Sequence, residues 1–139
     1  MAEKHKHLEL IQGVINRLST NSFLLKGWSV VLVSSLFALT AASDRAAFVV
    51  LAYMPVLVFW GLDGYFLWQE RLYRRLYDSV RIKGDGEIDF SMDVSAVRTG
   101  ESPPKWINVV FSRTLVTFHG ILIVSVIVVT VVTLMGGNG

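Results

Sequence analysis

Three long apolar stretches constrain this chain more than any other feature of its sequence. They are Phe23 to Ala42, Ala46 to Leu67 and Leu115 to Met135. A helix rises about 1.5 Å per residue, so each stretch can cross a hydrocarbon core roughly 30 Å thick. Hydrophobic residues make up 53% of the 139 residues and charged residues only 17%, which is unusual for a soluble domain. We therefore expect an all-α membrane protein with three transmembrane helices.

A very short turn joins the first two stretches. Only Ser43, Asp44 and Arg45 separate them, so the first two helices should form a tight antiparallel hairpin. The chain then divides into an N-terminal segment (1–22), a first span (23–42), an external turn (43–45), a second span (46–67), a polar segment (68–113), a third span (114–135) and an external C-terminal stub (136–139).

The N-terminal segment has the pattern of an amphipathic helix. Leu8, Ile11, Ile15 and Leu18 recur at helical spacing, with polar residues between them. Such a helix lies in the membrane interface or packs on other cytoplasmic segments. The polar run 19–22 interrupts the pattern and offers N-caps for the first span, so we expect the amphipathic helix to end there.

Small residues and a proline should shape the first two spans. Ser34, Ala38 and Ala42 are spaced by four, a pattern that lets helix backbones approach closely in lipid. Another helix should therefore pack on this stripe. Pro55 lies in the middle of the second span, where its ring and its missing N–H should kink the helix axis.

Two ionisable residues should meet inside this helical hairpin. Lys26 lies 18 positions before Asp44, and Asp63 lies 18 positions after Arg45, so both are about 27 Å of helix from the turn. Each would be costly alone against lipid, and we expect Lys26 and Asp63 to form an intramembrane ion pair. We interpret the pair as a clamp at the cytoplasmic rim in preference to a proton or ion relay.

Three further residues belong to this level of the membrane. Gly61 and Gly64 flank Asp63 and leave room for a close neighbouring helix. His119 lies about one and a half turns inside the third span. With no second ligand residue identifiable, we interpret this intramembrane polar residue as a packing or hydrogen-bonding group in preference to a metal ligand or proton carrier.

The second helix should continue beyond the bilayer. No Gly or Pro occurs from Trp68 to Arg81, and Leu72, Leu76 and Val80 recur at fours, which predicts one helix from Ala46 to Arg81 of about 54 Å. Basic residues gather near its end, where anionic lipid headgroups are the expected partner and an acidic protein is the alternative. These residues are Arg71, Arg74, Arg75, Arg81 and Lys83.

A turn signal follows, Gly84-Asp85-Gly86, with short alternating runs on either side. Apolar residues alternate with polar ones after the turn, which indicates a strand and a small β-hairpin. An isolated hairpin is marginal in water, so the strand would need a neighbouring subunit, a partner protein or the N-terminal helix. An irregular loop explains the pattern equally well. The apolar residues of this segment are Ile88, Phe90, Met92 and Val94.

The distribution of basic residues predicts the orientation. Of the 13 Lys and Arg residues, twelve lie either at or before Lys26 or from Arg71 to Arg113, and Arg45 alone lies on the other side. The positive-inside rule therefore places the N-terminus and the polar segment in the cytoplasm. In a bacterial cell this means a multi-pass protein of the inner membrane, with its turn and C-terminus in the periplasm.

The sequence offers no constellation of residues for catalysis. It has no Gly-rich phosphate loop, no paired histidine and carboxylate motif, no serine elbow and no cysteine. We expect no enzyme, no cofactor, no catalytic residue and no metal site, and we interpret His5 and His7 as part of a solvated basic tail. Membrane topology accounts for the net charge of +2, so nucleic acid is not an expected partner.

Several short motifs together resemble a family of small, uncharacterised bacterial membrane proteins with three spans. They are Asn21-Ser22-Phe23, Lys26-Gly27-Trp28, Trp60-Gly61-Leu62-Asp63-Gly64-Tyr65, Glu70-Arg71-Leu72 and Leu76-Tyr77-Asp78, within residues 7 to 81. The build is more loosely similar to the few-span membrane effectors of anti-phage and conflict systems. That resemblance implies oligomers that damage the membrane when a partner senses infection, and it implies no catalytic residue.

Three functions fit these features. The leading hypothesis is a homo-oligomeric effector or pore-forming component that is gated through its cytoplasmic layer, because one chain has too few polar intramembrane residues for a path of its own. The second is a membrane adaptor that recruits a cytoplasmic partner through residues 70–94. The third is a small proton- or ion-coupled transporter that uses Lys26, Asp63 and His119.

Overall fold

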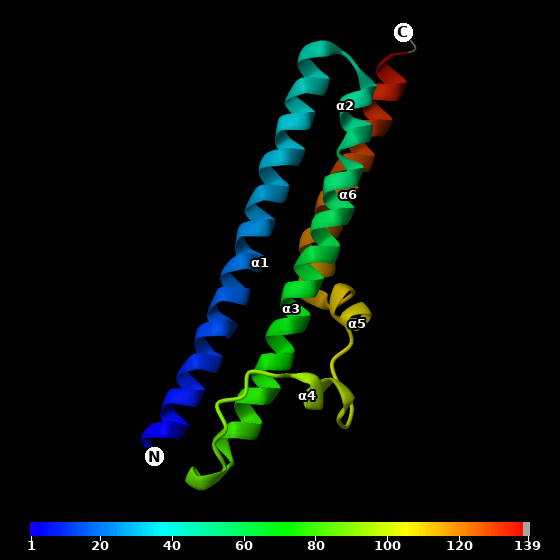
Figure 1. The fold of residues 1–139 in the computed structure, drawn as a ribbon. Helices are drawn as coiled ribbons and strands as arrows, with labels where there is room; N and C mark the ends of the chain where they lie inside the picture. The colour runs from blue at the N-terminus through cyan, green and yellow to red at the C-terminus, as the bar shows by residue number, and fades with distance from the viewer. Residues whose placement is uncertain (138–139) are drawn as a thin grey trace.

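The computed structural model describes residues 1–137 as a long bundle of helices (Figure 1). Its main elements are α1 (Ala2–Ser43), α2 (Ala46–Leu51), α3 (Tyr53–Arg81) and α6 (Arg113–Gly136). Three segments are long and apolar enough to cross a membrane, Ala2–Ser43, Ala46–Arg81 and Arg113–Gly136. The predicted set of three spanning helices is confirmed. Between α3 and α6 lie three short elements, η1 (Asp85–Glu87), α4 (Ser95–Thr99) and α5 (Trp106–Val110).

The two ends of the bundle differ (Figure 1). The N-terminus and the segment from η1 to α4 lie at one end, which we call the loop end. The turn between α1 and α2 and the end of α6 lie at the other, which we call the turn end. Of the expected C-terminal stub, 136–139, the last two residues lie outside the described part of the chain.

Helix α1 is a single helix of 42 residues, so the expected interruption at residues 19–22 is wrong. Its buried positions explain the continuity, because they follow one another at intervals of four or seven along the helix. Such spacing keeps one face turned toward a single neighbour. Ser22 belongs to this face and packs inward instead of capping a new helix. The buried residues are His7, Ile11, Ile15, Ser22, Ser29, Val33 and Thr40.

The connection at the turn end is tight, as the short spacer requires. Asp44 adopts the left-handed backbone conformation, with φ 55°, and its N–H donates to the carbonyl of Thr40 at 2.9 Å. Asparagine and aspartate tolerate this conformation better than most residues. Arg45 is extended, and α2 begins at the next residue. The first two spans therefore run antiparallel and side by side.

The second span is interrupted one turn before Pro55. Helix α2 ends at Leu51 and α3 begins at Tyr53. A proline in a helix removes one hydrogen bond, and its ring clashes with the carbonyl four residues earlier, here that of Leu51. Beyond this point α3 runs without a break to Arg81, as the absence of Gly and Pro after Trp68 predicts.

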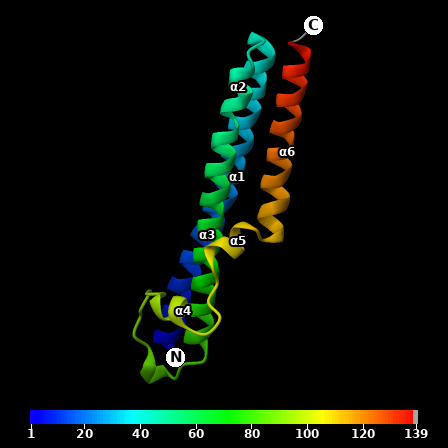
Figure 2. The same cartoon turned by 90° about the vertical axis from the view of Figure 1, so that its right-hand side faces the viewer.

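Two apolar clusters hold the bundle together. In the membrane half, Val33, Val49, Ala52, Val56 and Val126 are buried against one another, which joins all three spans. At the loop end, a second cluster joins α1 to the extension of α3. Its buried members are Ile11, Ile15, Leu76 and Val80. Helix α6 lies beside the α1/α3 pair and does not reach the loop-end cluster (Figure 2).

The expected β-hairpin is wrong, because residues 1–137 contain no strand. The segment after Gly84 is an irregular loop that wraps the loop end and leads through α4 and α5 to α6 (Figure 2). Ile88, Met92 and Val94 pack against the loop-end cluster, so this cluster takes the place of a pairing strand. Phe90 has φ 53° and breaks the extended run at its centre.

Candidate functional site

A buried cluster of polar side chains joins all three spans near the middle of the molecule. At its centre is Asp63 of α3, whose side chain is 0% exposed. Helix α1 contributes Ser22 and Lys26, and α6 contributes His119. We call these four residues the Asp63 cluster. It is the place where an isolated charge would be most costly to the fold.

Both carboxylate oxygens of Asp63 are engaged. Lys26 Nζ lies 2.6 Å from Oδ2, and His119 Nε2 donates to the same oxygen at 2.8 Å. Ser22 Oγ donates to Oδ1, and Lys26 Nζ also donates to Ser22 Oγ at 2.8 Å. Ser22 and Lys26 are one helical turn apart, so two consecutive turns of α1 contact the carboxylate of Asp63. Opposite charge and hydrogen bonds together offset the desolvation of Asp63.

Aromatic rings enclose His119, which is itself 0% exposed. The indole of Trp60 stacks on its ring, with centroids 5.8 Å apart and 9° between the planes. Phe118 meets the same ring edge-on at 5.1 Å. The second imidazole nitrogen, Nδ1, is buried and has no hydrogen-bond partner in the described residues. The bond to Asp63 therefore fixes the ring with its proton on Nε2.

The two glycines near Asp63 let α5 approach α3. A Cβ on Gly64 would lie 2.5 Å from Cγ2 of Val110 and 3.4 Å from its Cα, so only glycine fits there. Trp60 Nε1 donates to the carbonyl of Val110 at 2.9 Å. Trp106 Nε1 donates to the carbonyl of Gly61 at 3.2 Å. The neighbour that takes up the space beside these glycines is thus α5 and not another spanning helix.

The structure brings Lys26, Asp63 and His119 together, although only the pairing of Lys26 with Asp63 was expected from the sequence. Counting from the turn placed Lys26 and Asp63 at one depth, but nothing placed His119 beside them. Ser22 was missed as a site residue. The available signal was its spacing of four from Lys26, which puts both residues on one helix face.

The small-residue stripe of the first span is not covered by the chain's own helices. Ser34, Ala38 and Ala42 are all exposed, because α1 packs on α3 through its other face. On the outer face of α6, a groove of about 430 Å³ follows residues 116–125 around Gly120. A second apolar groove of about 430 Å³ surrounds Gly27 of α1. Both α1 and α6 therefore present hollowed faces that the chain leaves open.

The five basic residues of the α3 extension fall into two groups. Arg81 and Lys83 lie near carboxylates, Arg81 Nη2 at 3.7 Å from Asp78 and Lys83 Nζ at 3.9 Å from Asp89. The other three line a groove beside residues 103–109. They are Arg71, Arg74 and Arg75.

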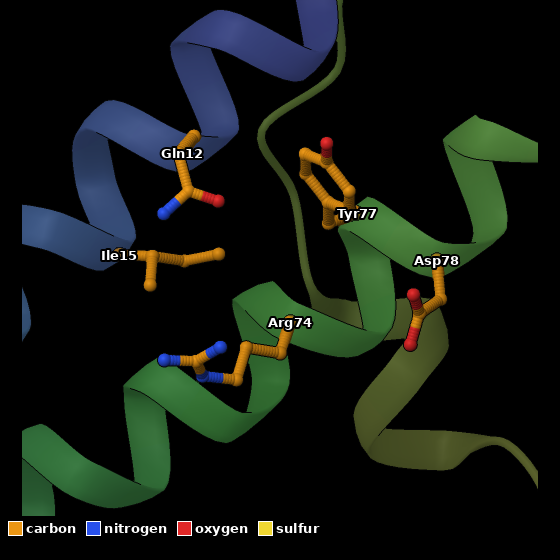
Figure 3. A pocket seen from close by; sticks show the side chains of 5 residues that line it. All are labelled: Gln12, Ile15, Arg74, Tyr77 and Asp78. Atoms are coloured by element: carbon orange, nitrogen blue, oxygen red, sulfur yellow. The ribbon is translucent and has the colours of Figure 1, made fainter.

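Arg74 also borders a polar cavity of about 270 Å³ between α1 and α3, drawn in Figure 3. Its lining side chains come from Gln12 and Ile15 on α1 and from Arg74, Tyr77 and Asp78 on α3. The Arg74 guanidinium is held by Glu70, with Nη2 2.8 Å from Oε1. The cavity borders the loop-end cluster through Ile15 and is open to the outside, so it provides no enclosed place for a reaction.

His7 is not part of a solvated tail, and that interpretation is wrong. Its side chain is fully buried, its Nε2 lies 2.8 Å from the carbonyl oxygen of Ser91, and its ring packs against Phe90. The helix already begins at Ala2, and Lys4 Nζ donates to the carbonyl of Lys83. Of the three neighbours expected for this loop, a second subunit, a partner protein or the N-terminal helix, the N-terminal turns of α1 are the one that contacts it in the structure.

Local hydrogen bonds hold two carboxylates of this loop in their charged form. The backbone N–H of Ser91 donates to Asp89 and, with nearby Lys83, lowers the pKa of that carboxyl. The hydroxyl and the N–H of Ser95 lower the pKa of Asp93 in the same way. These contacts shape the loop on its exposed side and bring no reactive pair together.

Within residues 1–137, no group of three or more His, Asp or Glu side chains is placed to hold a metal ion. Comparison with models of protein families, with curated proteins and with solved structures finds no match to this chain. The features of the chain that bear on its function are therefore the Asp63 cluster, the open helix faces and the loop end.

Proposed function

We propose that this protein is a non-enzymatic, homo-oligomeric protein of the bacterial inner membrane, a pore-forming effector of the kind used in anti-phage defence, gated through its loop end. The observation that carries the proposal is the uncovered stripe of Ser34, Ala38 and Ala42 on α1. In lipid, helices associate through small residues that let their backbones approach. A second copy of the chain is the partner that every bilayer containing this protein supplies.

Two different open faces favour a closed ring over a simple dimer. The α1 stripe and the α6 groove around Gly120 both face away from the helices' own packing. If the α1 face of one copy packs on the α6 face of the next, the contact is head to tail, and such contacts form a ring when the rotation from copy to copy closes. The groove around Gly27 extends the α1 face toward the loop end.

A single chain provides no polar path through the membrane in its described residues. Asp63 and His119 are fully buried inside the protomer, and large apolar side chains dominate the outer surface of the spans. Hydroxyls on the open faces, such as Ser35, Thr117 and Ser125, donate to carbonyls of their own helices. A hydrophilic lining would therefore form between copies, where such hydroxyls come together.

The loop end supports gating from the cytoplasm. The loop is tied to α1 by His7 and Lys4, and to α3 by Arg75, whose Nη1 donates to the carbonyl of Ser102 at 2.5 Å. Displacing the loop would uncover the loop-end cluster. A partner that binds residues 88–94 would thus change the contact between α1 and α3.

Oligomer formation can be tested by disulfide cross-linking, because the chain has no cysteine of its own. Ala38→Cys should cross-link to a second copy in native membranes after mild oxidation. Leu39→Cys is the matched control, since Leu39 is also exposed but points about 100° away around the helix. Cross-linking of Leu39→Cys alone, or of neither variant, would remove the proposed α1 interface.

Pore formation can be tested with dye-loaded liposomes. The double variant Ile88→Asp, Met92→Asp should release the loop from the loop-end cluster and raise dye leakage well above that of the wild type. If oligomers form but the liposomes retain their dye with both the wild type and the double variant, a pore is contradicted. That result would favour the alternative, a membrane adaptor that recruits a cytoplasmic partner.

A second candidate function, proton-coupled transport, is favoured by one observation, the meeting of Lys26, Asp63 and His119. The unpaired Nδ1 of His119 is a place where a proton could bind inside the cluster. Asp63→Asn would then abolish proton uptake by reconstituted vesicles while the oligomer persists. If Asp63→Asn lost its folding to the same extent as its activity, the result would favour a structural role of the cluster as a clamp.

A further inference from the structure

A basic groove lies between the extension of α3 and the chain that leads into α5. It has a volume of about 330 Å³. Four cationic side chains line it, three from α3 and one from the segment before α5, and the amide of Asn108 lies among them. Pro103 and Pro104 form its wall. The four cationic residues are Arg71, Arg74, Arg75 and Lys105.

The positive charge of this groove is only partly compensated. Among its cations, Arg74 alone has an ion-pair partner in residues 1–137, Glu70. Arg75 is held by the backbone carbonyls of Glu101 and Ser102. Four cations against one carboxylate leave three positive charges. Carbonyls fix the Arg75 guanidinium in place without neutralising it, so the groove is prepared for an anion.

The groove lies at the level expected for lipid phosphates. Trp68 and Trp106 sit on its membrane side, and Trp68 Nε1 donates to the carbonyl of Pro104 at 2.8 Å. Tryptophans mark the boundary between the hydrocarbon and the headgroups. Arg71 is one turn beyond Trp68 and Arg75 two turns, or about 5 and 10 Å. The headgroup region is itself about 5 to 7 Å thick.

We propose that this groove binds the phosphate of an anionic phospholipid headgroup, which bridges α3 and the segment before α5. Arginine side chains bind phosphate oxygens in a forked geometry, and Lys105 adds a flexible charge from the opposite wall. This lipid site is formed by a single chain, so it does not depend on whether several copies form the proposed pore. Arg81 and Lys83 lie outside the groove, where Arg81 pairs with Asp78 within α3 and Lys83 pairs with Asp89 of the loop.

The test measures lipid retention by the purified full chain, using native mass spectrometry. The protein is reconstituted in nanodiscs of phosphatidylcholine with phosphatidylglycerol. The wild type should retain phosphatidylglycerol. The variant Arg71→Gln, Lys105→Gln should bind it between about five- and thirtyfold more weakly, because each basic side chain near a membrane surface contributes roughly a factor of five.

The variant Arg81→Gln, Lys83→Gln is the matched control. It removes the same charge from the same end of the molecule, and it should retain the lipid as the wild type does. Equal losses in both variants would show a general attraction of the surface and would overturn the site. Full retention of phosphatidylglycerol by the variant Arg71→Gln, Lys105→Gln would also overturn the site. Displacement of the lipid by millimolar inorganic phosphate would assign the groove to a soluble anion instead.

Discussion

Asp63 is the residue on which the packing of three helices depends most. Its carboxylate is the common partner of Lys26 and His119, and it is fully buried. Polar contacts between membrane helices contribute only about 0.6 kcal/mol on average. Asp63 should exceed that value because removing it leaves the partly buried Lys26 without its counter-ion and the buried His119 imidazole without its acceptor. Breaking a buried ion pair costs about 3 to 5 kcal/mol in proteins.

Asp63→Ala should therefore lower the free energy of unfolding by at least about 2 kcal/mol, measured by denaturant titration in mixed micelles. Asp63→Asn, which keeps the shape and some of the hydrogen bonds, should lose less. Ser35→Ala is the control, since that hydroxyl is exposed and bonds only to its own helix. A stability of Asp63→Ala equal to that of the control would mean that the cluster is no clamp.

Gly64 gives a second prediction at the scale of single residues. A methyl group there would meet Val110 at 2.5 Å, and Val110 is held by the Trp60 indole through its carbonyl. Gly64→Ala should destabilise the protein by about 1 to 3 kcal/mol through overpacking. Adding Val110→Ala should recover part of the loss. Gly13→Ala, with no atom within 4 Å of the new Cβ, should be neutral or gain up to about 1 kcal/mol.

The residues of the Asp63 cluster were only partly predictable. The pairing of Lys26 with Asp63 could be predicted because both are the same number of residues from a three-residue turn. Two helices with the same rise per residue place such positions at one depth. The position of His119 depends on how α6 packs after the polar segment, 68–113, and no periodicity in the sequence encodes that. Ser22 was assigned to a helix cap because short polar residues favour caps, and packing against Asp63 overrode that preference.

At the scale of elements, α1 shows how tertiary packing overrides a local signal. Taken alone, the polar run 19–22 indicates the end of a helix. The buried positions on either side of it nevertheless lie on one continuous face toward α3. The amides of residues 19–22 should therefore exchange hydrogen as slowly as those of residues 12–16, measured by exchange mass spectrometry. Exchange as fast as in the loop at 84–87 would restore the two-helix interpretation.

In the loop, the sequence pattern predicted the packing of the side chains correctly but the secondary structure wrongly. Alternation at Ile88, Phe90, Met92 and Val94 predicted one apolar face, and three of the four residues do pack together on the loop-end cluster. The secondary structure was wrong because an extended chain needs a paired edge, and α1 and α3 offer only side chains. Phe90 then leaves the extended conformation and meets His7.

At the scale of the whole molecule, the number of spans follows from the length and hydropathy of three segments, but their direction depends on charge alone. The N-terminus, the loop and the end of α6 at Gly136 are positioned relative to the helices, but the apolar spans themselves do not distinguish one side of a membrane from the other. The proposed lipid site depends on this direction, because the cytoplasmic leaflet attracts basic segments through its negative surface potential. The direction in which the chain crosses the membrane is therefore the property on which the proposed gating and the proposed lipid site both depend.

Single cysteines can determine the threading, since the unmodified chain has none and serves as its own blank. Ser43→Cys at the turn end and Glu101→Cys at the loop end are both exposed. In intact bacterial cells, a membrane-impermeant maleimide should label Ser43→Cys and should label Glu101→Cys only after the inner membrane is opened. Twelve basic residues against one favour this result strongly. The reverse labelling would turn the loop end toward the periplasm, where no cytoplasmic partner could reach residues 88–94, and gating from the cytoplasm would have to be abandoned.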